Sequence, residues 1–212
     1  MIKLMADRGS LDPRCRELLD FYFVEASRPD CDLDTFRTRT KFWFMRNAAT
    51  DAEIRTRFAS LVESAVAGEL AAWKETPLGR LGLVVLLDQF SRNLNRDSAR
   101  AFDHDARALA LALEGVERGD PAALTPGEKL VFYLPIMHAE DTALQARCSQ
   151  LYTDLAGESA VLGPELEMAK KFALRHREII DRFGRFPHRN KVLGRESTPE
   201  EIAFLQEPNS SF

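Results

Sequence analysis

The chain has 212 residues, of which 29% are charged and 45% hydrophobic, and its formal net charge is −4. This composition is typical of a globular protein with a large core, and the acidic balance disfavours a general attraction to nucleic acid or anionic lipid. Cys15, Cys31 and Cys148 lie far apart, and the longest apolar run, LVVLL at 83–87, is too short to span a membrane. We therefore expect a soluble, cytoplasmic protein without a disulfide framework or a membrane segment.

Helix start and stop signals recur along the first half of the chain, whereas alternating strand patterns and Asn-Gly turns are missing. The predicted helices run from Asp12-Pro13 to the turn at Pro29, from Phe36 to Asn47, from a cap at Asp51, from Pro77 through RLGLVVLLDQFSRNL, and from Asp97 to near Gly119. The helix through 81–94 carries apolar residues on too many sides for a surface element. We expect it at the centre of the fold.

The second half of the chain continues this pattern. Thr125-Pro126-Gly127-Glu128 and Thr198-Pro199-Glu200-Glu201 both fit the capping box, in which a threonine and a glutamate satisfy each other's backbone amides. Pro135 interrupts the first of these helices and predicts a kink. Two further helices are expected, from Asp141 or Thr142 to about Gly157 and from Pro164 to Gly184.

These elements predict an all-α protein of about eight or nine helices, stacked antiparallel in a single domain. No Pro/Gly/Ser-rich linker divides the chain, so we assign residues 1–206 to that domain and residues 207–212 to a C-terminal tail. The sequence contains no clean repeat at a fixed period.

Polar side chains on the central helix and its neighbour need partners inside the protein. Asp88 and Arg92 are four residues apart and therefore lie side by side, with Gln89 and Asn93 next to them. A plain ion pair that orients neighbouring helices explains Asp88 and Arg92, and a ligand site explains them equally well. The buried polar groups must be satisfied internally in either case.

Histidines occur on two apolar helix faces. His138 shares a face with Val131 and Leu134, and His176 lies in an apolar stripe with Met168 and Phe172. A hydrogen-bonded core histidine is the simple interpretation of both, and burial predicts a neutral ring unless a carboxylate is adjacent. The acidic pair that follows His138, Glu140 and Asp141, can act as helix caps.

The stretch RFGRFPHRNKVLGR at 182–195 holds five lysine or arginine residues and a histidine, with no carboxylate. Gly184 ends the preceding helix, and Pro187 forces an extended exit. Phe183 and Phe186 can anchor the loop by burial. Its polar side chains are then directed by the backbone, and forked guanidinium groups suit carboxylate or phosphate. These side chains include Arg185, His188, Arg189 and Asn190.

Five words of the sequence resemble a known family, the bacterial domain-of-unknown-function family 924. They are FWF at 42–44, LLDQFSRN at 86–93, RAFDHDARAL at 100–109, FYLPIMHAED at 132–141 and RFGRFPHRNKVLGRESTPEE at 182–201. The resemblance covers nearly the whole chain and implies an all-helical superhelix similar to tetratricopeptide-repeat proteins. It implies no activity, cofactor or catalytic set. The family usually has proline where Ser91 stands, so a kink there is relaxed in this chain.

Several of the twelve polar residues in these words are expected to meet in one site. They are Asp88, Gln89, Arg92, Asn93, His138, Glu140, Asp141, His176, Arg185, His188, Arg189 and Asn190. The first hypothesis is a pocket for a small anionic ligand or an acidic peptide terminus. Helical superhelices commonly offer concave surfaces for such binding.

Three other functions remain open on the sequence. A hydrolase or transferase would use His138, His176 or His188 with Glu140 and Asp141, but no catalytic or metal-ligand motif is present, so neither cofactor nor metal is predicted. RNA binding through the 182–195 loop is disfavoured because the rest of the chain is acidic. A buried polar network that only fixes helix register, in a module that binds a protein partner, is the third.

Overall fold

The computed structural model describes residues 8–28, 30–208 and 210–211, and within these ranges every regular element is a helix. This confirms the all-α class. The α-helices are α1 (Pro13–Phe23), α2 (Leu33–Phe44), α3 (Ala48–Ala67), α4 (Pro77–Val84), α5 (Ser91–Leu94), α6 (Asp105–Arg118), α7 (Pro126–Phe132), α8 (Leu134–Met137), α9 (Thr142–Ala156), α10 (Gly163–Phe183) and α11 (Pro199–Phe204). Short 3₁₀ turns join several of them.

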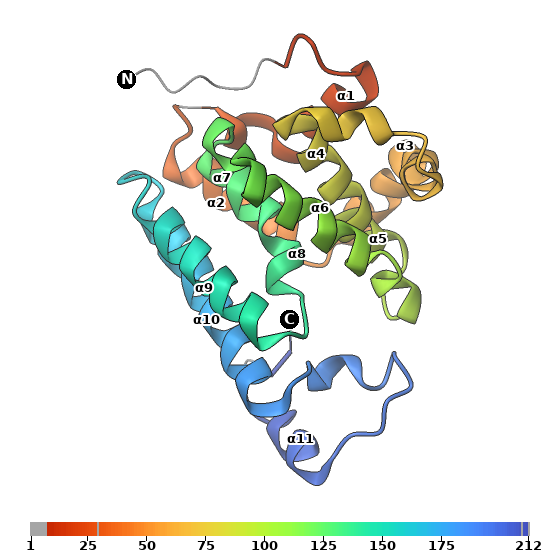
Figure 1. The fold of residues 1–212 in the computed structure, drawn as a ribbon, viewed down its shortest axis with the longest axis vertical. Coiled ribbons are helices and arrows are strands. Elements are labelled where there is room, and N and C mark those ends of the chain that lie inside the picture. The colour runs from red at the N-terminus through yellow and green to blue at the C-terminus, as the bar shows by residue number, and fades with distance from the viewer. Residues whose placement is uncertain (1–7, 29, 209, 212) are drawn as a thin grey trace.

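Helices α9 and α10 lie side by side, antiparallel, along one flank of the molecule, and α11 lies beyond the end of α10 (Figure 1). Helices α4, α6, α7 and α8 form the middle, with α1 and α3 on the side away from the α9–α10 pair. Helix α2 packs against α10. One large apolar cluster fills the interior of this stack, and a small second cluster lies under α11.

The central helix predicted from the LVVLL run is confirmed, because every residue from Leu78 to Ser91 is buried. Its middle is a π-helical segment, Val85–Phe90, that joins α4 directly to α5. The amide of Ser91 donates to the carbonyl of Leu86, five residues back, as a π turn requires. Such single π turns inside α-helices often mark functional sites, and this one carries Asp88 and Gln89.

Both predicted capping boxes are present, at Thr125 with Glu128 and at Thr198 with Glu201. Pro135 also has its expected effect, since the helix is interrupted between α7 and α8 at Tyr133. Within the described residues, no helix is both long enough and apolar enough to cross a bilayer.

Three local predictions are corrected. Helix α3 begins at Ala48 rather than after Asp51, because the Asn47 side chain accepts hydrogen bonds from the amides of Ala49 and Thr50. The helix expected after Asp97 begins only at Asp105, behind a 3₁₀ turn. Met168 and Phe172 are each 48% exposed. They lie outside the buried stripe of α10, which is formed instead by residues such as Leu166 and Ala173.

Candidate functional site

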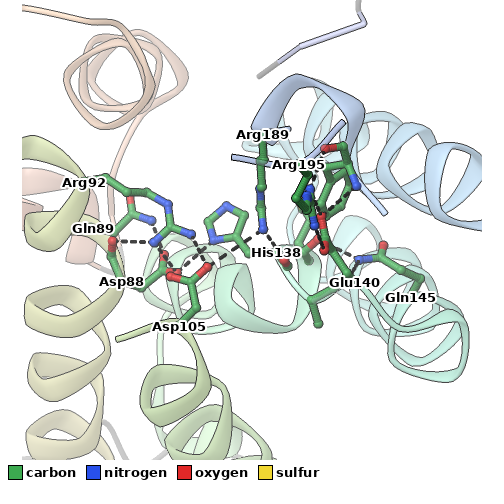
Figure 2. A network of polar contacts seen from close by, with 12 residues as sticks. Asp88, Gln89, Arg92, Asp105, His138, Glu140, Gln145, Arg189 and Arg195 are labelled. Atoms are coloured by element: carbon green, nitrogen blue, oxygen red, sulfur yellow. Dashed lines mark hydrogen bonds and ion pairs between the residues drawn. The ribbon is translucent and has the colours of Figure 1, made fainter. Parts of the chain in front are cut away.

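A cavity of about 650 Å³ opens between α2, α5, α8, α10 and the loop that follows α10. Its lining includes three of the four histidines, His138, His176 and His188, together with Arg92 and Arg189. The sequence analysis expected these segments to meet, and the structure places them around this one space. Figure 2 shows the network of polar contacts that includes Asp88, Arg92, His138 and Arg189.

Asp88 is the anchor of this polar centre. Its carboxylate is fully buried, and Oδ1 lies 2.8 Å from Nδ1 of His138 and 3.0 Å from Nη1 of Arg92 (Figure 2). The side-chain amide of Gln89 donates to the other oxygen. Burial opposes ionisation of Asp88, but the positive Arg92 and the bond from His138 outweigh it and hold the pKa of this carboxyl below its ordinary value. Asp88 is therefore a buried anion.

The ionised Asp88 fixes the tautomer of His138. A carboxylate only accepts hydrogen bonds, so Nδ1 of His138 carries the proton and Nε2 carries a lone pair. Burial lowers the pKa of His138, and the nearby Arg92 and Arg189 act in the same direction, although Asp88 opposes them. The ring is neutral at pH 7, and His138 lines the cavity.

Arg189 reaches this centre from the loop after α10. Its guanidinium packs 4.5 Å from the ring centre of Phe186 and 5.0 Å from that of Phe102, so it is held on two faces. Nη1 donates to the backbone carbonyl of His138 at 3.0 Å and lies 3.9 Å from Asp105 Oδ2. The side chain is only 8% exposed, and Nε has no hydrogen-bond partner among the described residues. Burial lowers the pKa of Arg189 to about 10, so it remains charged at pH 7.

His176 and His188 are the other two histidines that line the cavity. Nδ1 of His176 donates to the carbonyl of Phe172 at 2.8 Å, because a carbonyl can only accept. The ring of His176 lies 6.4 Å from that of His138, and His188 packs 5.7 Å from the ring of Phe186. Burial lowers the pKa of His176 to about 3 and that of His188 to about 4. Both are neutral at pH 7.

Most of the basic loop has a structural task instead of a place in the cavity. Arg185 makes two bonds to Glu201, at 2.7 and 2.9 Å, and the side-chain amide of Asn190 donates to the same glutamate. Arg195 grips Glu140, which also accepts the amide of Phe186 at 2.8 Å. These internal carboxylates neutralise the stretch that looked uncompensated in the sequence. Of its five cations, all of them described, Arg189 is the one that lines the cavity.

Two more expected site residues also have local tasks. Asp141 caps α9 by accepting the amide of Leu144 at 2.8 Å, and it does not line the cavity. Asn93 lines the cavity, but its side-chain amide donates to Asp51.

The sequence analysis did not select Asp105, Phe102 or Gln145. Asp105 receives Arg92 at 3.0 Å, and Phe102 stacks on Arg189. Gln145 donates to the carbonyls of Met137 and Ala139 and so fixes the end of α8, next to His138. Phe102 and Asp105 lie inside the family word RAFDHDARAL, and this was the sequence feature that could have pointed to them. Nothing local marks Gln145, whose contacts are tertiary.

Among the described residues, no group of three or more His, Cys, Asp or Glu side chains is arranged to hold a metal ion. The rings of His138 and His176 lie 6.4 Å apart in a tilted arrangement, and their Nδ1 atoms are directed at Asp88 and at the carbonyl of Phe172. The cavity lining does contain a buried cation, Arg189, whose Nε has no hydrogen-bond partner among the described residues.

Fold and cavity together define an all-helical domain with a polar centre buried in its middle. The chain matches the model of a family described as bacterial protein of unknown function, DUF924, over residues 18–209. It is similar to a solved structure, a protein of unknown function called ATU0120 from Agrobacterium tumefaciens. The two are 36% identical over 92% of this chain and 97% of that one, with a TM-score of 0.75. No curated protein matches. The chain belongs to the DUF924 family.

Proposed function

We propose that this protein binds a small organic anion in the cavity, with the anionic group at Arg189. The observation that supports this most strongly is a rigidly stacked guanidinium on the cavity wall with a buried, unused Nε donor. A buried donor without a partner is unfavourable, and an incoming carboxylate oxygen would relieve this. An acidic peptide offers the same carboxylate group. The size of the ligand that binds therefore distinguishes a small organic anion from a peptide.

The volume of the cavity agrees with this proposal, since pockets for small molecules commonly measure about 300–1,000 Å³. The internal pairing of Arg185 and Arg195 supports it further, because it leaves few cations to follow a nucleic-acid backbone. A cytoplasmic location is proposed as well, on the grounds that all three cysteines are free thiols and two of them are buried.

Thermal-shift screening tests anion binding directly. Carboxylates and phosphates from a broad panel should raise the melting temperature of the wild type, because a ligand at 100 times its Kd adds about 2.7 kcal/mol of stability. Arg189→Met should lose this response. Arg182→Met is the matched control, because Arg182 is on the neighbouring turn, half-exposed and paired with Glu200. A silent panel, or an equal response from Arg189→Met, would contradict the proposal.

A second function, acid–base catalysis, is favoured by the 2.8 Å contact between Asp88 and His138. A neutral imidazole oriented by a buried carboxylate can take a proton from water or substrate through Nε2, and Asp88 then stabilises the imidazolium. Glu140 and Asp141, which the sequence offered as partners, are bound by Arg195 and Leu144 instead. Hydrolysis of p-nitrophenyl butyrate should then drop at least 100-fold in His138→Gln, whereas equal rates would reject the role.

A further inference from the structure

The walls of the cavity indicate a class of ligand, an inference that rests on the proposed anion site. Beside the polar centre the lining is apolar and aromatic, from Trp43 and Phe44 on α2 to Leu134 and Met137 on α8 and Phe172 on α10. Such a lining stabilises a ligand by burying the carbon surface of that ligand. A small inorganic anion would leave most of the apolar lining exposed to water.

The polar atoms of this wall are already used inside the protein. The indole nitrogen of Trp43 donates to the carbonyl of Tyr22 at 2.8 Å, and the hydroxyl of Tyr152 donates to that of Leu130 at 2.7 Å. Gln89 accepts from Tyr22 and donates to Asp88. Both aromatic residues therefore present ring carbon to the cavity. Polar lining residues elsewhere are paired as well, since Arg46 binds Asp97 and the amide of Asn93 donates to Asp51.

The exposed part of the cavity lining includes two aromatic rings as well as the Arg46–Asp97 ion pair. Phe44 at the end of α2 is 52% exposed and Phe172 on α10 is 48% exposed, and both belong to the lining. Large aromatic rings that stay half in water at the entrance of a pocket are a feature that a ligand can cover. The two rings come from helices that pack against each other, so one apolar chain can contact both.

Charge at the inner end limits the ligand to a single negative charge. Asp88 and Asp105 balance Arg92 and Arg189 through contacts of 3.0 to 3.9 Å, and the three imidazoles are neutral. A monoanion adds one charge to this neutral group. A dianion adds a second, with Asp88 and Asp105 close behind the cations, and the repulsion grows accordingly.

We propose that the cavity takes an amphipathic monocarboxylate, a molecule with one carboxylate and an alkyl chain or aromatic ring. The carboxylate accepts from Nε of Arg189 at the inner end. The apolar part lies along the wall of α2, α8 and α10 and covers Phe44 and Phe172 at the mouth.

Isothermal titration with octanoate, butyrate, acetate, octan-1-ol and inorganic phosphate tests this class. Each buried methylene strengthens binding about fourfold, so octanoate should bind at least ~10-fold more tightly than butyrate even when only half of the added chain is buried. Octan-1-ol should bind at least ~10-fold more weakly than octanoate, because it lacks the charge that Arg189 receives.

Variants assign the two parts of the ligand. Arg189→Met should remove the preference for octanoate over octan-1-ol, and Phe172→Ser should shrink the gap between octanoate and butyrate to less than threefold. Ile202→Ser is the matched control, because Ile202 is 54% exposed on α11 and does not line the cavity. It should leave all affinities unchanged.

The outcomes separate this inference from anion binding itself. Acetate or phosphate binding as tightly as octanoate would overturn the amphipathic ligand and leave an anion site in place. Failure of every carboxylate and of phosphate would overturn both proposals. Octanoate that binds Arg189→Met as tightly as the wild type would place the interaction on apolar surface alone and overturn the inference.

Discussion

Two buried arginines in this protein are held in different ways. Arg80 is fully buried on α4. It donates to Asp120 at 2.8 Å and to the carbonyl of Lys74 at 2.6 Å, and its Nη1 lies 3.1 Å from Glu114 in an ion pair without making a hydrogen bond. Arg189 has one backbone carbonyl at 3.0 Å, a carboxylate at 3.9 Å and two aromatic faces, and its Nε is unused. Arg80 is thus paired with two carboxylates within 3.1 Å, whereas the carboxylate of Asp105 lies 3.9 Å from Arg189.

The surroundings follow the same division. Around Arg80 no space remains, and a Cβ atom at Gly115 would lie 2.7 Å from the Cδ atom of Arg80. Arg189 instead lines a cavity of about 650 Å³. The two arginines are alike in burial, and each has one nitrogen without a hydrogen-bond partner; they differ in how closely carboxylates pair with them and in the packing around them.

Removing the Arg80 charge should have the largest effect on stability. Arg80→Met leaves Asp120 buried without its cation, and breaking a buried ion pair in this way destabilises by roughly 3–5 kcal/mol. Urea denaturation monitored by helical circular dichroism measures the loss. Arg118→Met is the control, because Arg118 is half-exposed and 3.7 Å from Glu114, and it should change stability by less than about 0.5 kcal/mol. Equal losses in both variants would remove the distinction drawn above.

Acidification should act on the cavity side first. The pKa of His176 is lowered to about 3 and that of His188 to about 4, from an ordinary 6.5, both by burial. Below pH 6.5 the unfolded chain therefore binds protons on these histidines that the native state does not bind. The free energy of unfolding is highest above pH 6.5 and declines as the pH falls toward 4. From pH 7 to pH 5 the two rings should lower the free energy of unfolding by roughly 2–4 kcal/mol.

Urea titrations at several pH values follow this decline. The double variant His176→Gln with His188→Gln should flatten it in the window from pH 7 to pH 5, where the carboxylates with lowered pKa, such as Glu201, stay ionised. A profile as steep as that of the wild type would show that the acid-sensitive groups lie elsewhere in the molecule.

Tight packing on the Arg80 side predicts a smaller loss for Gly115→Ala. The new Cβ would lie 2.5 Å from the ring of Phe132 and 2.9 Å from Asp120, so the ring must move. Overpacking of this kind costs about 1–3 kcal/mol, and the better helix propensity of alanine offsets up to ~1 kcal/mol of it. Gly157→Ala, with its nearest atom at 3.6 Å, is the matched control in urea denaturation. Equal stability of the two variants would contradict the packing argument.

Local chemistry explains what could be predicted from the sequence. The two capping boxes and the interruption at Pro135 depend on residues within four positions of one another, so they were readable in advance. The central position of the helix around Asp88 followed from its apolar residues. The family words led to the right fold class, all-α, because they are distributed along most of the chain.

Tertiary partners explain what could not be predicted. The basic loop seemed uncompensated because Glu140 and Glu201, which bind Arg195 and Arg185, lie 55 and 16 residues away along the chain. The π turn at Val85–Phe90 leaves no periodic signal, since its single extra residue shifts the helix face only once. Asp105 was missed because its partner, Arg92, comes from another element.

Arg189→Met should have the smallest effect on stability, and the difference between the two arginines depends on this result. The variant loses one hydrogen bond to the carbonyl of His138, worth about 1 kcal/mol, and is relieved of a desolvated cation with an unused Nε. The methionine thioether can still pack on Phe102 and Phe186. Stability in urea should therefore stay within about 1 kcal/mol of the wild type, well above that of Arg80→Met. A loss of 3 kcal/mol or more, without any ligand response in the wild type, would mean that the polar centre only fixes helix register and that both arginines have the same role.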